Sequence, residues 1–219
     1  MKNTARLTAA IAATLATGAA HAGFVYSDTA PPDQATRTVL PVNAFQSQLA
    51  AGGATMFYVG TSLALDEASP VNVAYFGKEA LFTNRFVWAG TTIGTTGAGL
   101  LDPWAERGLG TFDAGAGVLD FEFCTSGGFG SGGVFYEPAC LSNAAADSDD
   151  PDELQSIGYW ISPDGGTAWL LFDDGGGGDA RSYDDQVIRL QTVPEPGTLG
   201  LLGAGLLAIG AAARRRRRG

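Results

Sequence analysis

The chain has 219 residues, of which 23 are acidic and 13 are Lys or Arg, giving a formal charge of −10 at pH 7. An acidic surface disfavours nucleic acid and anionic lipid, so neither is an expected partner. The one histidine, His21, lies near the N-terminus, and residues 23–193 therefore hold no imidazole for Ser-His-Asp or Cys-His catalysis or for zinc and copper binding. The composition argues against an enzyme.

The first 22 residues have the pattern of a secretory signal peptide. A positive start is followed by an apolar stretch and a small-x-small cleavage site, made respectively of Lys2 and Arg6, Leu7–Thr17, and Ala20 with Ala22. We expect the Sec machinery to export the chain and the mature protein to begin at Gly23. Cysteine pairing is then favoured, because the exported chain enters an oxidising compartment.

Residues 23–193 are long enough for one domain with a substantial core. They contain six basic and 22 acidic residues, so this part alone carries a formal charge of −16. Short apolar and β-branched runs separated by Gly, Pro, Asn and Asp predict an all-β fold, a single antiparallel β-sandwich of jelly-roll type. The predicted strands are Phe24–Tyr26, Thr36–Val42, Thr55–Leu65, Val71–Phe76, Leu81–Ala89, Val118–Cys124, Val134–Tyr136, Ser156–Ile161, Ala168–Phe172 and Gln186–Val193.

Three further segments complete the expected secondary structure. A short helix is expected near Ala44–Ala51, and the Gly- and Thr-rich segment Thr91–Leu100 is expected to form a long turn. The segment Asn143–Glu153 is expected to form an exposed acidic loop. Its carboxylates could complete a cation site, but a solvated loop is the simpler interpretation.

Cys124 and Cys140 are the only cysteines. An even count in an exported chain favours a disulfide that closes the Gly- and Ser-rich loop between them. Such a bridge would contribute about 3 kcal/mol on the loop-entropy account. The alternative is two free thiols, and a metal site made from two cysteines without histidine is less favoured.

Aspartates flank a glycine-rich loop within Leu170–Leu190. Carboxylates and glycine carbonyls are hard oxygen ligands, and Ca²⁺ needs six to eight of them. The loop lacks the spacing of an EF-hand or of a β-roll repeat, and turn aspartates that bond their own backbone are the alternative. The candidate calcium ligands are Asp173, Asp174, Asp179, Asp184 and Asp185.

The same segment resembles the end of a β-sandwich module that is common in bacterial surface proteins. That module ends with Phe-Glu-Asp, a Gly-rich loop, Asp, an aromatic-Asn-Asp triplet and a strand. Here the matching residues are Phe172–Asp174, Asp179 and Tyr183–Asp185, with Asp184 in place of the usual Asn. The resemblance supports a β-sandwich and makes calcium a candidate ligand.

Two other binding functions are open. The four tryptophans, Trp88, Trp104, Trp160 and Trp169, could form a platform for stacking sugars, although tryptophans within strands usually pack in the core. Paired carboxylates of a glycoside hydrolase are conceivable in so acidic a chain, but no local pattern selects a pair.

The last residues, Val193–Gly219, have three parts in a fixed order. Pro194, Glu195 and Pro196 form a segment that is expected to be extended, because proline fixes φ and lacks an N–H. The uncharged run Thr198–Ala213 would span about 24 Å as a helix, somewhat less than a hydrocarbon core of about 30 Å. The final element is a run of five arginines, Arg214, Arg215, Arg216, Arg217 and Arg218, that would stay cytoplasmic.

This order resembles the PEP-CTERM sorting signal of exported proteins in Gram-negative bacteria. The resemblance implies transient insertion in the inner membrane, cleavage near Pro194–Pro196 by an exosortase-type membrane transpeptidase, and release or attachment at the cell surface. An ordinary membrane anchor that is never cut is the alternative. The chain thus divides into a signal peptide (1–22), a β-sandwich (23–193) and a sorting signal (194–219).

The sequence therefore favours a structural or interaction protein of the cell surface or extracellular matrix. The sorting family implies an association with exopolysaccharide or biofilm. The alternatives are a calcium-dependent or carbohydrate-binding lectin-like module and, less favoured, an exported hydrolase that uses carboxylates.

Overall fold

The computed structural model describes most of the region between the two chain ends. The described residues are 22–27, 36–39, 45–54, 56–97, 99–130, 133–145, 155–175, 183–194 and 205, with backbone alone for 36–39 and 145. The compact unit discussed below is Ala22–Val193, here called the body. The predicted signal residue Ala20 lies outside the described residues, as do Glu195, Pro196 and Arg214–Arg218 of the predicted sorting signal.

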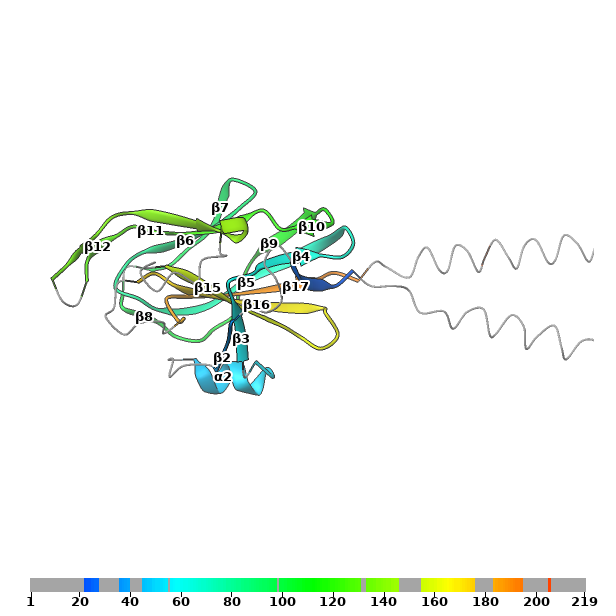
Figure 1. The fold of residues 1–219 in the computed structure, drawn as a ribbon, viewed down its shortest axis with the longest axis horizontal. Coiled ribbons are helices and arrows are strands. Elements are labelled where there is room, and N and C mark those ends of the chain that lie inside the picture. The colour runs from blue at the N-terminus through cyan, green and yellow to red at the C-terminus, as the bar shows by residue number, and fades with distance from the viewer. Residues whose placement is uncertain are drawn as a thin grey trace, which may run out of the picture. The chain divides into compact units, whose positions relative to one another are not determined.

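The body is all-β, and every strand pair in its described part is antiparallel (Figure 1). The largest sheet has eight strands, with β9 beside β5 and off the main path. In sheet order these strands are β2 (Thr36–Val39), β3 (Met56–Val59), β15 (Ser156–Ile161), β16 (Thr167–Asp173), β17 (Gln186–Thr192), β5 (Ser69–Glu79) and β8 (Leu101–Asp102), and the off-path strand is β9 (Arg107–Ala114).

Three smaller sheets complete the described body. The four-stranded sheet runs β14 (Ala139–Ser142), β11 (Phe121–Thr125), β6 (Asn84–Trp88) and β7 (Thr91–Thr95). The three-stranded sheet runs β1 (Phe24–Ser27), β4 (Ser62–Leu65) and β10 (Gly117–Val118). The hairpin of β12 (Gly128–Phe129) and β13 (Phe135–Tyr136) is the fourth sheet.

The main hydrophobic core lies between the large sheet and the smaller ones. Alternate residues of the central strands point into it, as expected for strands with one face on the core. Phe172 of β16 stacks on Phe123 of β11 with ring centroids 4.9 Å apart, so the two layers contact each other directly. This arrangement is consistent with the predicted β-sandwich, while the jelly-roll connectivity stays a prediction.

A second core covers the outer face of the large sheet. The expected short helix is present as α2 (Gln46–Ala51), and its Leu49 is fully buried there together with Phe57 and Leu171. No helix in the described part of the chain is both long and apolar enough to cross a bilayer. The predicted membrane helix, Thr198–Ala213, lies outside the described residues apart from Gly205.

Three secondary-structure expectations need correction. The predicted turn Thr91–Leu100 instead begins with strand β7, because its threonines pair with β6 at the edge of the four-stranded sheet. The predicted strand Thr55–Leu65 is two strands, since Gly60 breaks it with a φ of 69° that favours glycine. Strand β9 was not predicted, because its glycines hide the alternation of its side chains, and the short strands β8, β12 and β14 were not predicted either.

The start of the predicted acidic loop also differs from expectation. Asn143 lies in the short 3-10 helix η1 (Asn143–Ala145) and is fully buried. Its Nδ2 donates to the carbonyls of Leu63 and Leu119, both at 2.8 Å, and its Oδ1 accepts from the Leu63 N–H at 2.9 Å. One carboxamide thus satisfies three buried backbone groups, which explains why this polar residue is inside. Residues 146–154 of the loop lie outside the described residues.

Candidate functional site

Four of the predicted calcium-binding aspartates come together where β16 ends and β17 begins. Residue Phe172 pairs with Gln186 in the register of these strands, so the aspartates on either side of that pair are neighbours. The Asp185 N–H donates to the Phe172 carbonyl at 3.1 Å and extends the ladder. All four side chains are buried: Asp173, Asp174, Asp184 and Asp185 are 6%, 3%, 4% and 8% exposed. The fifth, Asp179, lies outside the described residues.

Local hydrogen bonds hold these aspartates. The Asp174 N–H donates to Asp185 Oδ2 at 2.7 Å, which links the end of β16 to the residue before β17. The Gly175 N–H donates to Asp173 Oδ1 at 2.9 Å, the turn bond that the alternative interpretation expects. The buried Tyr183 has a φ of 54°, a conformation that is uncommon for a bulky residue. The chain is therefore tightly constrained where it enters β17.

The site extends across the sandwich to Asn84, the first residue of β6. Its Nδ2 donates to Asp174 Oδ2 at 2.9 Å and to the Asp185 carbonyl at 3.1 Å. The residue is fully buried, and its Oδ1 has no hydrogen-bond partner among the described residues. Sequence reasoning missed Asn84, since an asparagine at the start of an apolar strand has the pattern of an ordinary strand boundary.

A buried cation lies beside these carboxylates. Lys78 of β5 is fully buried, and its Nζ donates to the carbonyls of Ala80 at 3.4 Å and Phe82 at 3.2 Å. Burial lowers the pKa of Lys78, and the charges of Asp102, Asp174 and Asp185 oppose this. Burial and the charge of Asp174 raise the pKa of Asp185 to about 9. Burial thus disfavours the charged forms of both Lys78 and Asp185.

The four carboxylates do not all converge on one point. In the described part of the chain, the only three Cys, Asp or Glu ligand atoms within 4.8 Å of one another belong to Glu122, Cys124 and Cys140. The two sulfurs of that group form a disulfide with each other, so they are not thiolate ligands. A cation at the aspartates would therefore need neutral oxygens besides carboxylates.

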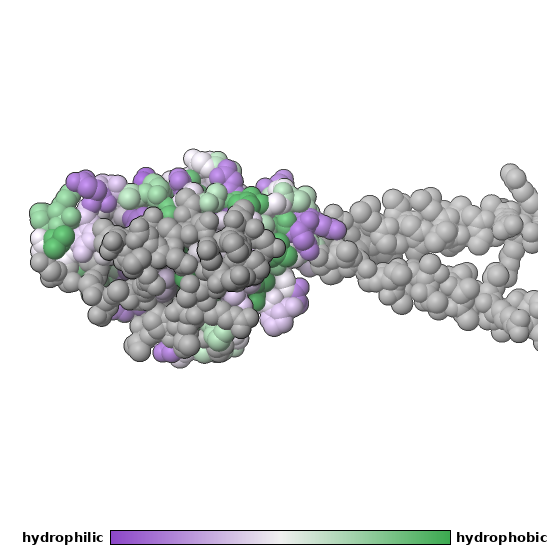
Figure 2. All heavy atoms as spheres, viewed as in Figure 1, coloured by the Kyte–Doolittle hydropathy of each residue, from purple (hydrophilic) through white to green (hydrophobic). Residues whose placement is uncertain are grey.

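The disulfide predicted from the cysteine count is present. Cys124 of β11 and Cys140 of β14 are directly opposite in the four-stranded sheet, and their Cα atoms are 4.0 Å apart. The bridge closes the base of the β12–β13 hairpin. Beyond it, Phe129 and Phe135 pack edge to face at 5.2 Å and are 71% and 52% exposed. Apolar surface at this end of the body is coloured green in Figure 2.

The four tryptophans do not form one platform. Trp88 is buried in the inner core, whereas the other three lie on the outer face of the large sheet. Trp160 pairs with Trp169 across β15 and β16, and the rings of Trp104 and Trp169 are 5.5 Å apart. Trp104 and Trp160 are only partly buried, so they keep some exposed aromatic surface.

The point where the chain leaves the body is well defined. The Thr192 N–H donates to the Gly166 carbonyl at 3.0 Å, and the Val193 N–H donates to the Pro70 carbonyl at 2.9 Å. The next residue, Pro194, is exposed and has no N–H to continue this pairing. The sorting signal thus begins where the last strand stops.

Comparison with known proteins identifies this segment. Residues 192–218 match the PEP-CTERM protein-sorting motif, in agreement with the resemblance of the tail. No curated protein and no solved structure matches the chain. The motif and the fold define a class: an exported, β-rich protein of a Gram-negative bacterium that is sorted by a membrane exosortase. Within that class, the particular features of this chain are its disulfide-closed hairpin and its buried aspartates.

Proposed function

We propose that the body is a structural or interaction module that the tail delivers to the cell surface or extracellular matrix, in association with exopolysaccharide or biofilm. The observation that carries this proposal is the sorting motif that starts at the last residue of β17. The exposed Pro194 follows a backbone held by Gly166 and Pro70, so a membrane transpeptidase could reach the segment without unfolding the sheet. Cleavage at Pro194–Pro196 would leave the body intact.

The test is the chemical identity of the mature C-terminus. Mass spectrometry of the surface form should find it at or near Pro194–Pro196. A matched variant, Pro194→Ala with Pro196→Ala, should keep the tail and stay in the inner membrane fraction. A surface form that still carries Arg214–Arg218 would overturn the proposal in favour of a permanent anchor.

We also propose that the body has no enzymatic activity of its own. Catalysis by serine or cysteine nucleophiles normally needs a base such as histidine, and residues 23–193 contain none. Two of the buried aspartates already accept structural hydrogen bonds: Asp174 from the Asn84 side chain, and Asp185 from the Asp174 main chain. Hydrolysis of polysaccharide by the purified protein, abolished by Asp174→Asn, would contradict this.

A second candidate function is carbohydrate binding on the outer face of the large sheet. The specific observation is the partly exposed Trp160, which is the cross-strand neighbour of the buried Trp169, itself the neighbour of Arg189 on β17. The Arg189 guanidinium lies 4.8 Å from the Phe76 ring centroid and pairs with Glu106 at 2.5 Å. Flat aromatic faces beside paired polar groups suit sugar rings.

Binding of purified polysaccharide would be measured through tryptophan fluorescence. Trp160→Ala should weaken it, while Trp88→Phe in the inner core should not. Equal binding by the Trp160→Ala variant would exclude this face as the sugar site.

A further inference from the structure

Two buried carboxamides near the aspartates have unused polar atoms. Asn84 is fully buried, and its Oδ1 has no partner among the described residues, although its Nδ2 is fixed on Asp174 and Asp185. Gln186 is also fully buried, and neither atom of its carboxamide has a partner in the described chain. A buried polar group left without a partner destabilises a fold by roughly 1–3 kcal/mol. Such groups call for an explanation, and an ion bound beside the aspartates is one explanation.

One of these carboxamides contacts a carboxylate directly. Asn84 Nδ2 is 2.9 Å from Asp174 Oδ2, and Oδ1 belongs to the same small amide group. Asp185 Oδ2 is 2.7 Å from the Asp174 main-chain nitrogen, so the second carboxylate adjoins the first. Gln186 follows Asp185 directly, and its side chain points to the inner face with Ile188 and Leu190. The oxygens come from both layers of the sandwich.

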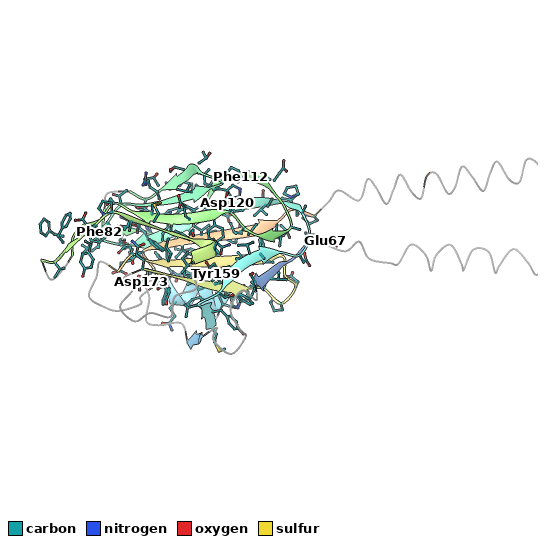
Figure 3. The ribbon with its side chains drawn as sticks, turned by 45° about the horizontal axis from the view of Figure 1, so that its top comes forward. Glu67, Phe82, Phe112, Asp120, Tyr159 and Asp173 are labelled. Atoms are coloured by element: carbon teal, nitrogen blue, oxygen red, sulfur yellow. A yellow bond between two sulfur atoms is a disulfide. The ribbon has the colours of Figure 1, made fainter. Side chains whose placement is uncertain are left out.

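We propose that this end of the body binds a calcium ion between the two sheets, with Asp174 and Asp185 from the β16–β17 connection and Asn84 Oδ1 from β6 as ligands. Asp173 and Asp184 are buried close by. The proposal concerns the body alone and does not depend on the sorting function. It assigns Asn84 a role that would hold the four-stranded sheet against the large one (Figure 3, Asp173 end).

The chemistry of the donors favours calcium over other ions. All are hard oxygens, carboxylate or carboxamide, and the described site offers neither histidine nor a free thiol. Calcium tolerates irregular geometry and completes its six to eight ligands with water and main-chain carbonyls, whereas Mg²⁺ demands a near-ideal octahedron. The positive charge of Lys78 nearby weakens the attraction for a cation. We expect an affinity in the range of extracellular calcium modules, with Kd about 10⁻⁴–10⁻³ M.

The experiment compares thermal unfolding of the intact chain in mild detergent, first in EDTA and then with CaCl₂ added to tenfold above this Kd. Tm should rise by roughly 3–6 °C. The same concentration of MgCl₂ should give a much smaller shift. Isothermal titration of the wild type with CaCl₂ should give one ion per chain, which makes the test independent of any variant.

Substitutions at Asn84 separate a ligand from a purely structural residue. Asn84→Leu and Asn84→Asp both lose the Nδ2 bonds, so both should unfold earlier in EDTA. Only Asn84→Asp keeps an oxygen, and it alone should retain the calcium-induced rise in Tm. Asp174→Asn should reduce the rise, and the exposed Asp113→Asn on β9 is the matched control that should leave it unchanged.

Two results would overturn the proposal. One is wild-type protein that shows neither heat of binding nor a change of Tm at this calcium concentration. The other is an Asn84→Leu variant that folds and keeps the full calcium response. If neither Asn84 variant folds, the wild-type titration and the Asp174→Asn variant decide whether calcium binds at this site.

Discussion

The two ends of the body are stabilised by different kinds of contact, although the same strands run through both. At the exit end, where β16 begins and β17 stops, main-chain hydrogen bonds join the segments: Phe24 and Thr192 donate to the carbonyls of Gly165 and Gly166 at 2.8 and 3.0 Å. Side chains such as Asp66 add to these bonds. At the far end, four buried aspartates, a buried lysine and a disulfide lie close to the β6–β11 pair. In Figure 3, Glu67 marks the first end, and Phe82 and Asp173 mark the second.

This difference matches two roles: the exit end carries the sorting signal, and the far end carries the candidate binding site. Main-chain bonding at the exit end holds the chain firmly up to Val193, whatever the sequence of the tail beyond it. Buried charges at the far end are poor stabilisers, because desolvation offsets their attraction. The far end nevertheless keeps these buried charges, and a disulfide closes the neighbouring hairpin. Both features are expected of a functional site whose surroundings hold it in place.

The largest expected effect is loss of the disulfide at the far end. Cys124→Ser with Cys140→Ser should lower the free energy of unfolding by about 3 kcal/mol, because the bridge restricts the unfolded chain. Urea unfolding measures this, and reduced wild type should match the variant. Among amides that exchange by local opening, exchange should accelerate at Phe123 and Leu141 but not at Phe24 and Val193. Equal acceleration of this exchange at both ends would show that the two ends do not open independently.

The next effect concerns Lys78. Lys78→Met keeps the apolar stem but removes an ammonium that donates to two carbonyls, so stability in EDTA should fall by about 2 kcal/mol. The same change removes a positive charge beside Asp174 and Asp185, so calcium should bind more tightly and recover part of the loss.

The control is Arg85→Met, which removes one exposed positive charge from β6. Its effect on the stability in EDTA and on the calcium affinity should be small. Equal calcium affinity in Lys78→Met and wild type would mean that Lys78 does not act on the cation site.

The sequence predicted what depends on local order and missed what depends on contacts between layers. The predicted strand Gln186–Val193 is present as β17, the second half of the predicted strand Val118–Cys124 is present as β11, and the cysteine count predicted the disulfide. The aspartates were identified because they flank one loop. Asn84 and Asn143 were not, since each contacts segments 24–101 residues away. Nothing local distinguishes such asparagines from those in turns.

The smallest expected effect is at the exit end and depends on processing. The Gly23 nitrogen donates to Asp66 Oδ1 at 2.6 Å, and the Asp66 N–H donates to the Gly23 carbonyl at 3.1 Å. If signal peptidase cleaves after Ala22, as the small-x-small pattern predicts, this nitrogen becomes a charged amino group and the hydrogen bond becomes an ion pair. Processing would then create an ion pair at the exit end.

Asp66→Asn should therefore destabilise the mature chain by less than about 1 kcal/mol, the usual size for an exposed pair. In the chain that still carries residues 1–22 the same substitution should have a smaller effect, because an asparagine oxygen still accepts from the uncharged Gly23 N–H, although more weakly than a carboxylate. The difference between the two chains in urea unfolding measures the ion pair, and it should shrink in high salt. An equal effect in both chains would mean that Asp66 acts through its turn alone, and that the exit end is held by main-chain bonds before and after processing.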